Sequence, residues 1–268
     1  MRKIVAALDN SIAARAVLAT AGRLAPLFDA EVEAVHVGED GDRVASDAAA
    51  AAGLELRLLE GPTVPALVAA GEDEDVVVLV LGTRRLPVGA IGSTALDVIT
   101  SLLKPVVVVP PDAARTGGLK RVLVPLEGTP QTSLAPKGLI ELAHDADVEV
   151  VVLHVHDAAT LPSFTDQPQH EAAAWRDEFV ARYCPWGIGK VSLQVRFGRR
   201  EEKILRAAVE THADLIALGW AQDLAAGRAP IVREVLERGR VPVLLVPSRV
   251  VRTDEREEQW TGLRSSPG

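Results

Sequence analysis

The chain of 268 residues is long enough for one large domain or two of ordinary size. Its hydrophobic fraction of 48% and charged fraction of 25% are ordinary for a globular protein, and its net charge of −8 argues against non-specific nucleic-acid binding, which depends on basic side chains. The apolar runs fall well short of the ~18 residues of a membrane helix. We expect no signal peptide before the first strand-like run, and Cys184 is the only cysteine. We therefore expect a cytoplasmic protein without a membrane span or an internal disulfide.

Strand-like and helix-like segments alternate from the start of the chain. Several strands are continuous apolar, β-branched runs, which predicts a parallel sheet with helices on both faces. The predicted strands span 3–8, 31–37, 55–60, 76–81 and 105–109, and the helices between them span 11–28, 41–52, 63–71 and 93–103. Right-handed crossovers then predict an open, doubly wound sheet of about five strands.

The sequence then repeats itself. Residues in the early part of the second copy lie 118 positions after their counterparts in the first copy. Residues in its later part lie 137 positions after theirs. An insertion in the second copy between His154 and Gly198 explains the change, and such constant offsets indicate an internal duplication. The matching pairs are 4–9 (IVAALD) with 122–127 (VLVPLE), His36 with His154, Gly61 with Gly198, and 104–110 (KPVVVVP) with 241–247 (VPVLLVP).

The repeat defines the expected organisation of the chain. The predicted domains span 1–111 and 120–248, with a short linker at 112–119 and a polar tail at 249–268. We expect the insertion to lengthen the second helix of the second copy, around 169–183. The strands predicted in that copy span 121–126, 148–156, 191–197, 215–218 and 242–246.

Polar residues after the first strand are the first site candidates. In an open α/β sheet, ligands bind beyond the carboxyl ends of the strands, where the strand order reverses. The carboxylate of Asp9 stands there and can accept hydrogen bonds from an adenine amino group or a ribose hydroxyl. Asp9-Asn10-Ser11 before an apolar run is also typical of an ordinary helix N-cap, so both interpretations stay open.

A glycine-rich loop follows the fourth strand and leads into a helix. At its end, Gly92-Ser93-Thr94 offers N–H groups, two hydroxyls and the positive end of a helix dipole, which together suit an anion. Arg84 and Arg85 can add charge-assisted hydrogen bonds to phosphate. The alternative is a plain turn in which Ser93 or Thr94 caps the helix and both arginines face solvent.

This loop resembles the strand-four motif of the universal stress protein family, Gly-x2-Gly-x9-Gly-Ser/Thr. Gly82 matches the first glycine and Gly92-Ser93 matches the last pair. Arg85 stands at the second glycine, with Gly89 as a partial substitute. The loop is about three residues shorter than the motif, which favours a mononucleotide or ADP over a triphosphate.

The resemblance covers 3–109 and 120–247, which are essentially both copies. It implies an α/β fold of two tandem Rossmann-like domains of the adenine nucleotide alpha hydrolase-like type, each with a five-stranded parallel sheet and helices on both faces. It also implies antiparallel pairing of the two fifth strands, so that the chain forms an intramolecular pseudo-dimer. Each fifth strand is apolar and would otherwise leave an edge open to pairing. A homodimer of chains is left open.

The resemblance further implies a stress-response protein that binds an adenine nucleotide (ATP, ADP or AMP), with or without magnesium, in the first copy. We expect a sensor or regulator with an unknown protein partner rather than an enzyme, because no general base or acidic metal ligand is evident near Gly92. The alternative is a non-nucleotide-binding interaction protein whose sites have decayed in both copies. The predicted nucleotide-binding residues are Asp9, Val37, Leu81, Gly82, Arg85, Gly89, Gly92, Ser93 and Thr94.

The second copy departs from this pattern. Glu127 stands at the position of Asp9, and Ala229-Pro230-Ile231 replaces Gly92-Ser93-Thr94. Pro230 has no N–H to donate and both hydroxyls are gone, so we predict that the second copy does not bind a nucleotide in the same way. The anion contacts that remain there are weak candidates, namely Gly227, Arg228 and Arg233.

Other polar residues favour structural interpretations. His36 and His154 alternate with apolar neighbours and lack a carboxylate or cysteine cluster, which favours hydrogen-bonded structural histidines over a metal or catalytic role. Gly198-Arg199-Arg200 reads as a helix start, with arginines lining a groove as the alternative. Cys184 is expected to be packed rather than reactive.

Overall fold

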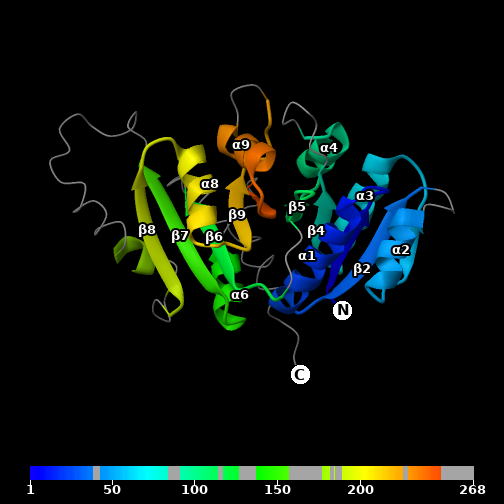
Figure 1. Cartoon of the computed structure of the whole chain (residues 1–268), viewed down its shortest axis with the longest axis horizontal. Coiled ribbons are helices and arrows are strands. Elements are labelled where there is room, and N and C mark those ends of the chain that lie inside the picture. Colours follow the sequence, from blue (N-terminus) through cyan, green and yellow to red (C-terminus); the bar gives the residue numbers. More distant parts are fainter. Residues whose placement is uncertain are drawn as a thin grey trace.

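The computed structural model describes residues 1–38, 43–83, 91–113, 117–126, 137–156, 177–181, 184, 189–225 and 229–248. Its two halves lie side by side, and each alternates strands with helices (Figure 1). The N-terminal half contains β1 (Lys3–Leu8), α1 (Ala13–Phe28), β2 (Glu31–Val37), α2 (Arg43–Ala51), β3 (Leu56–Leu59), α3 (Thr63–Glu72), β4 (Val76–Gly82), α4 (Ser93–Ser101) and β5 (Val106–Val109). The C-terminal half contains β6 (Arg121–Leu126), α6 (Lys137–Asp145), β7 (Glu149–His156), β8 (Val191–Phe197), α8 (Arg200–Glu210), β9 (Leu215–Trp220), α9 (Pro230–Arg238) and β10 (Val243–Pro247).

All ten strands form one continuous sheet in the order β3-β2-β1-β4-β5-β10-β9-β6-β7-β8. Within each half the neighbouring strands are parallel. The strand order reverses between β1 and β4, and again between β6 and β9. The predicted fold class, two doubly wound α/β halves, is therefore confirmed.

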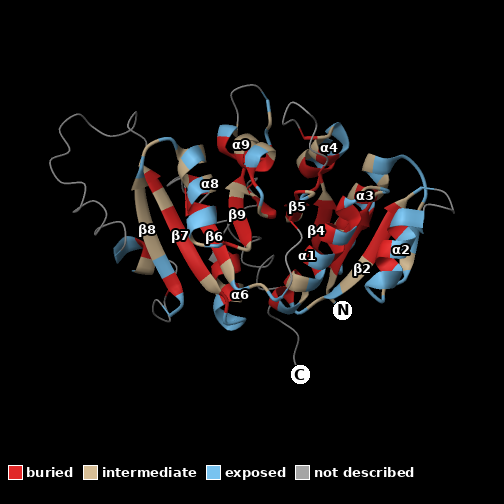
Figure 2. Ribbon diagram, in the orientation of Figure 1, coloured by how far each residue is buried: buried red, intermediate tan, exposed pale blue. Residues whose placement is uncertain are grey.

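Helices cover both faces of this sheet because successive strand residues point to opposite sides. Ile4, Ala6 and Leu8 of β1 join the buried layer under α1, α2 and α6, whereas Val5 and Ala7 join the layer under α3, α4, α8 and α9. Each layer runs through both halves without a break. Figure 2 shows the strands as mostly buried and the outer helix faces as exposed. No helix among the described residues is long and apolar enough to cross a membrane.

The halves join through antiparallel pairing of β5 with β10. Val107 pairs with Leu244, its own equivalent in the repeat. Val106 and Val108 likewise pair with the equivalents of each other, Leu245 and Val243. A two-fold axis relates two copies in this way, and the register therefore confirms the intramolecular pseudo-dimer.

An ion pair also joins the two halves. Arg23 on α1 forms a 2.7 Å ion pair with Asp214, which precedes β9, and the two side chains are only 9% and 13% exposed. Arg23 Nε also donates to Gly117 O over 2.9 Å, which holds part of the predicted linker. The second carboxylate oxygen of Asp214 accepts from the backbone N–H groups of Lys120 and Arg121.

The predicted element bounds need small corrections. The fifth strands begin at Val106 and Val243 rather than at the preceding prolines, which have no N–H for a ladder. The fourth strands extend to Gly82 and Trp220. Of the helix predicted at 169–183, residues 177–181 are helical, and the others lie outside the described residues.

Candidate functional site

The strand register brings three predicted site residues to one edge of the N-terminal sheet. Leu8 pairs with His36 and Ala7 pairs with Leu81. Asp9 follows β1, Val37 ends β2 and Gly82 ends β4, so all three lie at the carboxyl edge, with Asp9 and Gly82 beside the point where the strand order reverses. Ligands of open α/β sheets bind at such a point.

The carboxylate of Asp9 organises the turn into α1. Its Oδ1 accepts hydrogen bonds from the backbone N–H of Ser11 at 3.1 Å and from the Ser11 hydroxyl at 2.5 Å. The Ser11 Oγ in turn accepts from the N–H of Ala13, the first residue of the helix. Asp9 therefore has the structural role that the helix-start interpretation predicts, and a ligand would have to use the carboxylate in addition to these bonds or in their place.

The end of β4 lies very close to the start of α1. A Cβ at Gly82 would stand 3.1 Å from Ala13 Cβ and 3.2 Å from Val17 Cγ2, so glycine is needed here for packing. Leu81 is buried in the core beneath α3 and α4, where its side chain cannot meet a ligand. Thr83 is buried as well, and its N–H donates to Val109 O at 3.0 Å.

The start of α4 is open in the way an anion site requires. Its N-cap residue, Gly92, has extended backbone and supplies no side-chain hydrogen bond to the first turn. Ser93 and Thr94 are exposed, and a Cβ built at Gly92 would meet nothing within 4 Å. The first-turn N–H groups of a helix attract anions because they lack partners within the helix. The other two predicted contacts, Arg85 and Gly89, lie outside the described residues.

The equivalent helix in the C-terminal half starts differently. Ala229 at the N-cap of α9 has a left-handed backbone with φ of 43°, and Pro230 occupies the first turn. The guanidinium of Arg233, a weak anion candidate, donates to the backbone carbonyl of Leu224. Trp220, which replaces Thr83, is buried. The remaining candidates, Glu127, Gly227 and Arg228, lie outside the described residues.

Gln222, between β9 and α9, is a residue that the sequence analysis did not predict. It is 3% exposed, and its Nε2 donates across the interface to the carbonyl of Leu102 at the end of α4. Its φ of 57° is a left-handed conformation that favours glycine. The offset of 137 aligns Gln222 with Arg85, the position of the motif's second glycine. That alignment was the signal that could have identified it.

The histidines and the cysteine have the expected structural surroundings. His36 Nδ1 donates to Leu8 O at 2.8 Å, and His154 Nδ1 donates to Leu126 O at 3.2 Å, so the equivalent residues join equivalent strands. Cys184 is buried, which raises the pKa of its thiol. Burial lowers the pKa of Lys104 despite the acidic residues 72–75 around it, and its ammonium donates to the backbone carbonyl of Val76 at 2.8 Å. Within the described ranges, no three His, Cys, Asp or Glu residues form a group that could hold a metal ion.

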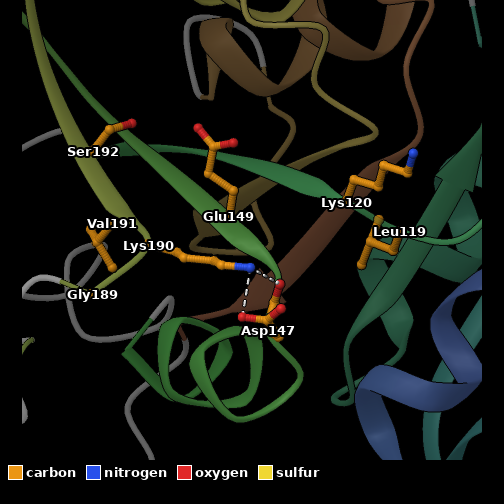
Figure 3. A pocket seen from close by; sticks show the side chains of 8 residues that line it. All are labelled: Leu119, Lys120, Asp147, Glu149, Gly189, Lys190, Val191 and Ser192. Atoms are coloured by element: carbon orange, nitrogen blue, oxygen red, sulfur yellow. Dashed lines mark hydrogen bonds and ion pairs between the residues drawn. The ribbon is translucent and has the colours of Figure 1, made fainter.

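A hollow of about 540 Å³ lies elsewhere, at the amino ends of β6, β7 and β8. Lys120, Asp147, Glu149 and Lys190 contribute to its lining, and Figure 3 shows Lys190 directed at Asp147, with an Nζ–Oδ1 distance of 2.6 Å. Its charges are of both signs, and it lies at the edge opposite to the one where α/β sheets bind ligands. We therefore do not take it as the functional site.

The fold and this carboxyl edge define a class of protein, a tandem α/β pseudo-dimer with a Rossmann-like corner in each half. Residues 118–247 match the universal stress protein family. This match covers the C-terminal half of the chain, and the N-terminal half has the same fold.

Solved structures of about the same length have this fold. A universal stress protein from Archaeoglobus fulgidus DSM 4304 aligns over 92% of this chain and 98% of its own, with 17% identity and a TM-score of 0.64. A functionally unknown protein from Pseudomonas aeruginosa PAO1 aligns over 98% of this chain and 97% of its own, with 14% identity and a TM-score of 0.67. The chain matches no curated protein sequence.

Proposed function

We propose that the N-terminal half binds an adenine nucleotide at its carboxyl edge and that the protein acts as a nucleotide-dependent regulator. The observation that supports this proposal is that Asp9, Val37 and Gly82 end or follow strands at one carboxyl edge, with Asp9 and Gly82 beside the point of strand reversal. The Asp9 carboxylate would accept from the adenine or ribose, and the backbone of Val37 would meet the adenine. The open turn at Gly92-Ser93-Thr94 would hold the phosphate.

The site offers binding groups rather than catalytic ones. A hydrolase needs a general base or a metal ion that activates the attacking water. Among the described residues of this edge, Asp9 is the carboxylate beside the point of strand reversal, and its Oδ1 already accepts two hydrogen bonds from Ser11. We therefore propose binding and release of the nucleotide as the working cycle, with conformational change or a protein partner as the output.

The experiment is a thermal-shift series of the full chain with ATP, ADP, AMP and cyclic nucleotides. A nucleotide at 100 times its dissociation constant stabilises the folded state by about 2.7 kcal/mol. Asp9→Ala and Ser93→Ala should each abolish the shift. Asp223→Ala is the matched control, because Asp223 Oδ1 accepts from the N–H two residues later, Ala225, at 2.9 Å, as Asp9 does from Ser11, but in the other half.

The second candidate function is an interaction protein that binds no nucleotide. The hydrogen bonds between Asp9 and Ser11 favour it, since they give the carboxylate a purely structural role. Under that account, Asp9→Ala lowers the melting temperature as much with nucleotide present as without it. A shift that survives both Asp9→Ala and Ser93→Ala, or no shift with any nucleotide, would contradict our proposal.

A further inference from the structure

A second group of polar side chains lies at the carboxyl edge of the C-terminal half. His154 and His156 project from β7, and Phe197 ends the neighbouring strand β8, opposite His156. The rings of His154 and His156 meet edge to face at 4.5 Å between centroids, and His156 stacks on Phe197 at 5.2 Å. Phe197 is 44% exposed, so the cluster reaches the surface.

Arg200, the first residue of α8, completes the cluster. Burial lowers the pKa of His154 in this cluster, and electrostatic interactions with His156 and Arg200 lower it further. The chain turns from β8 into α8 at Gly198, whose N–H donates to His156 O at 2.9 Å. One tight turn therefore holds Arg200 close to the ends of both strands.

Two nitrogen atoms of this cluster are buried without a hydrogen-bond partner. They are Nε2 of His156 and Nε of Arg200. Within the described part of the chain, Arg200 also forms no ion pair, whereas its neighbour Arg196 is paired with Glu210 at 2.8 Å. A buried guanidinium donor without an acceptor is destabilising, and an oxyanion is the group that would satisfy it.

We propose that Arg200 and His156 form a binding site for a phosphate-type oxyanion at the carboxyl edge of the C-terminal half. The Nε–H of Arg200 and the Nε2–H of His156 donate to the oxyanion, and Phe197 flanks it as an apolar wall. This site differs in chemistry from the nucleotide site proposed for the other half, and it does not depend on that proposal.

The test is a titration of the full chain with inorganic phosphate at constant ionic strength, followed by the NMR signals of the His156 ring. We expect saturable shifts of that ring and about tenfold weaker binding in Arg200→Gln, since a hydrogen bond between charged groups has that weight. Arg206→Gln is the matched control. It removes the same charge from the same helix, but Arg206 is exposed and paired with Glu210.

Arg200→Lys keeps the charge, so this variant should bind phosphate with intermediate affinity. It also shows whether a loss of binding in Arg200→Gln reflects misfolding. AMP titrated into Ser93→Pro, which removes the first-turn donor of the other half, distinguishes the source of the phosphate. Tighter binding of AMP than of phosphate assigns a nucleotide phosphoryl group, and weaker binding assigns free phosphate. Equal phosphate binding by Arg200→Gln and the unchanged chain, or no saturable shift of His156, would overturn the site.

Discussion

The two halves share one fold but differ at the corner that follows their fourth strands. In the N-terminal half, α4 starts at Gly92 with exposed hydroxyls and open space. In the C-terminal half, α9 starts at a left-handed Ala229 followed by Pro230, and Gln222 from the same corner reaches across to Leu102. The difference shows that one scaffold can have an open helix start after the fourth strand in one copy and an interface contact there in the other.

The hydrogen bond of Gln222 also links the interface to the helix of the proposed ligand site. The carbonyl that Gln222 binds belongs to Leu102, at the C-terminal end of α4. The N-terminal end of the same short helix is the proposed phosphate contact. A nucleotide that shifts α4 would therefore act directly on a buried hydrogen bond between the halves.

The largest expected effect concerns the interface itself. Asp214→Ala leaves the nearly buried Arg23 without its ion pair and removes the acceptor of two backbone N–H groups. We expect the free energy of unfolding to fall by about 3 kcal/mol. Urea unfolding measures it, with Asp147→Ala as the control, since that exposed pair with Lys190 should contribute at most about 1 kcal/mol. Similar losses in the two variants would show that the ion pair between Arg23 and Asp214 does not hold the halves together.

Ser93→Pro makes the first corner resemble the second. Proline suits the first turn of a helix, and the extended backbone of Gly92 suits a residue before proline, so the fold should stay intact. The variant should lose the nucleotide-induced stabilisation of about 2.7 kcal/mol that saturating ligand gives. Thermal shift checks the loss, and circular dichroism checks the fold.

The reverse change gives the control for that prediction. Pro230→Ser restores a donor to α9, but the buried Trp220 and Gln222 still fill the corner. We therefore expect no nucleotide binding to appear in the C-terminal half. A gain of binding there would show that proline alone closes the second site.

The smallest effect compares the two N-cap positions. Ala229→Gly should raise the free energy of unfolding by about 1 kcal/mol, because φ of 43° strains any residue with a Cβ. Gly92→Ala should change it by at most about 0.5 kcal/mol, since φ is −60° and a Cβ there meets nothing within 4 Å. Chemical unfolding of both variants measures the difference, and equal effects would contradict the described backbone at the two corners.

Much of the fold could be predicted because it follows from local patterns. Continuous apolar runs gave the buried parallel strands, and the two offsets of the repeat gave two halves of the same order. The antiparallel pairing of the fifth strands was predicted from the family resemblance, and the structure confirms it. The domain limits at 111 and 120 and the role of the tail stay predictions.

The contacts that distinguish the halves could not be predicted, since they join residues far apart in sequence. Arg23 and Asp214 carry no motif, and a lone arginine on a predicted helix is usually solvated. Leu81, directly before the motif's first glycine, was included in the predicted site, yet alternation along β4 turns its side chain into the core. Asp9 fits both of its interpretations, because an aspartate that organises a helix start stands where a ligand-binding aspartate would stand.

Calorimetric titration with ADP tests the central claim most directly, because it counts sites as well as measuring affinity. The account predicts one ADP per chain, with binding lost in Ser93→Pro and kept in Pro230→Ser. Two equivalent sites, or one site that persists in Ser93→Pro, would contradict the assignment of the nucleotide to the N-terminal half.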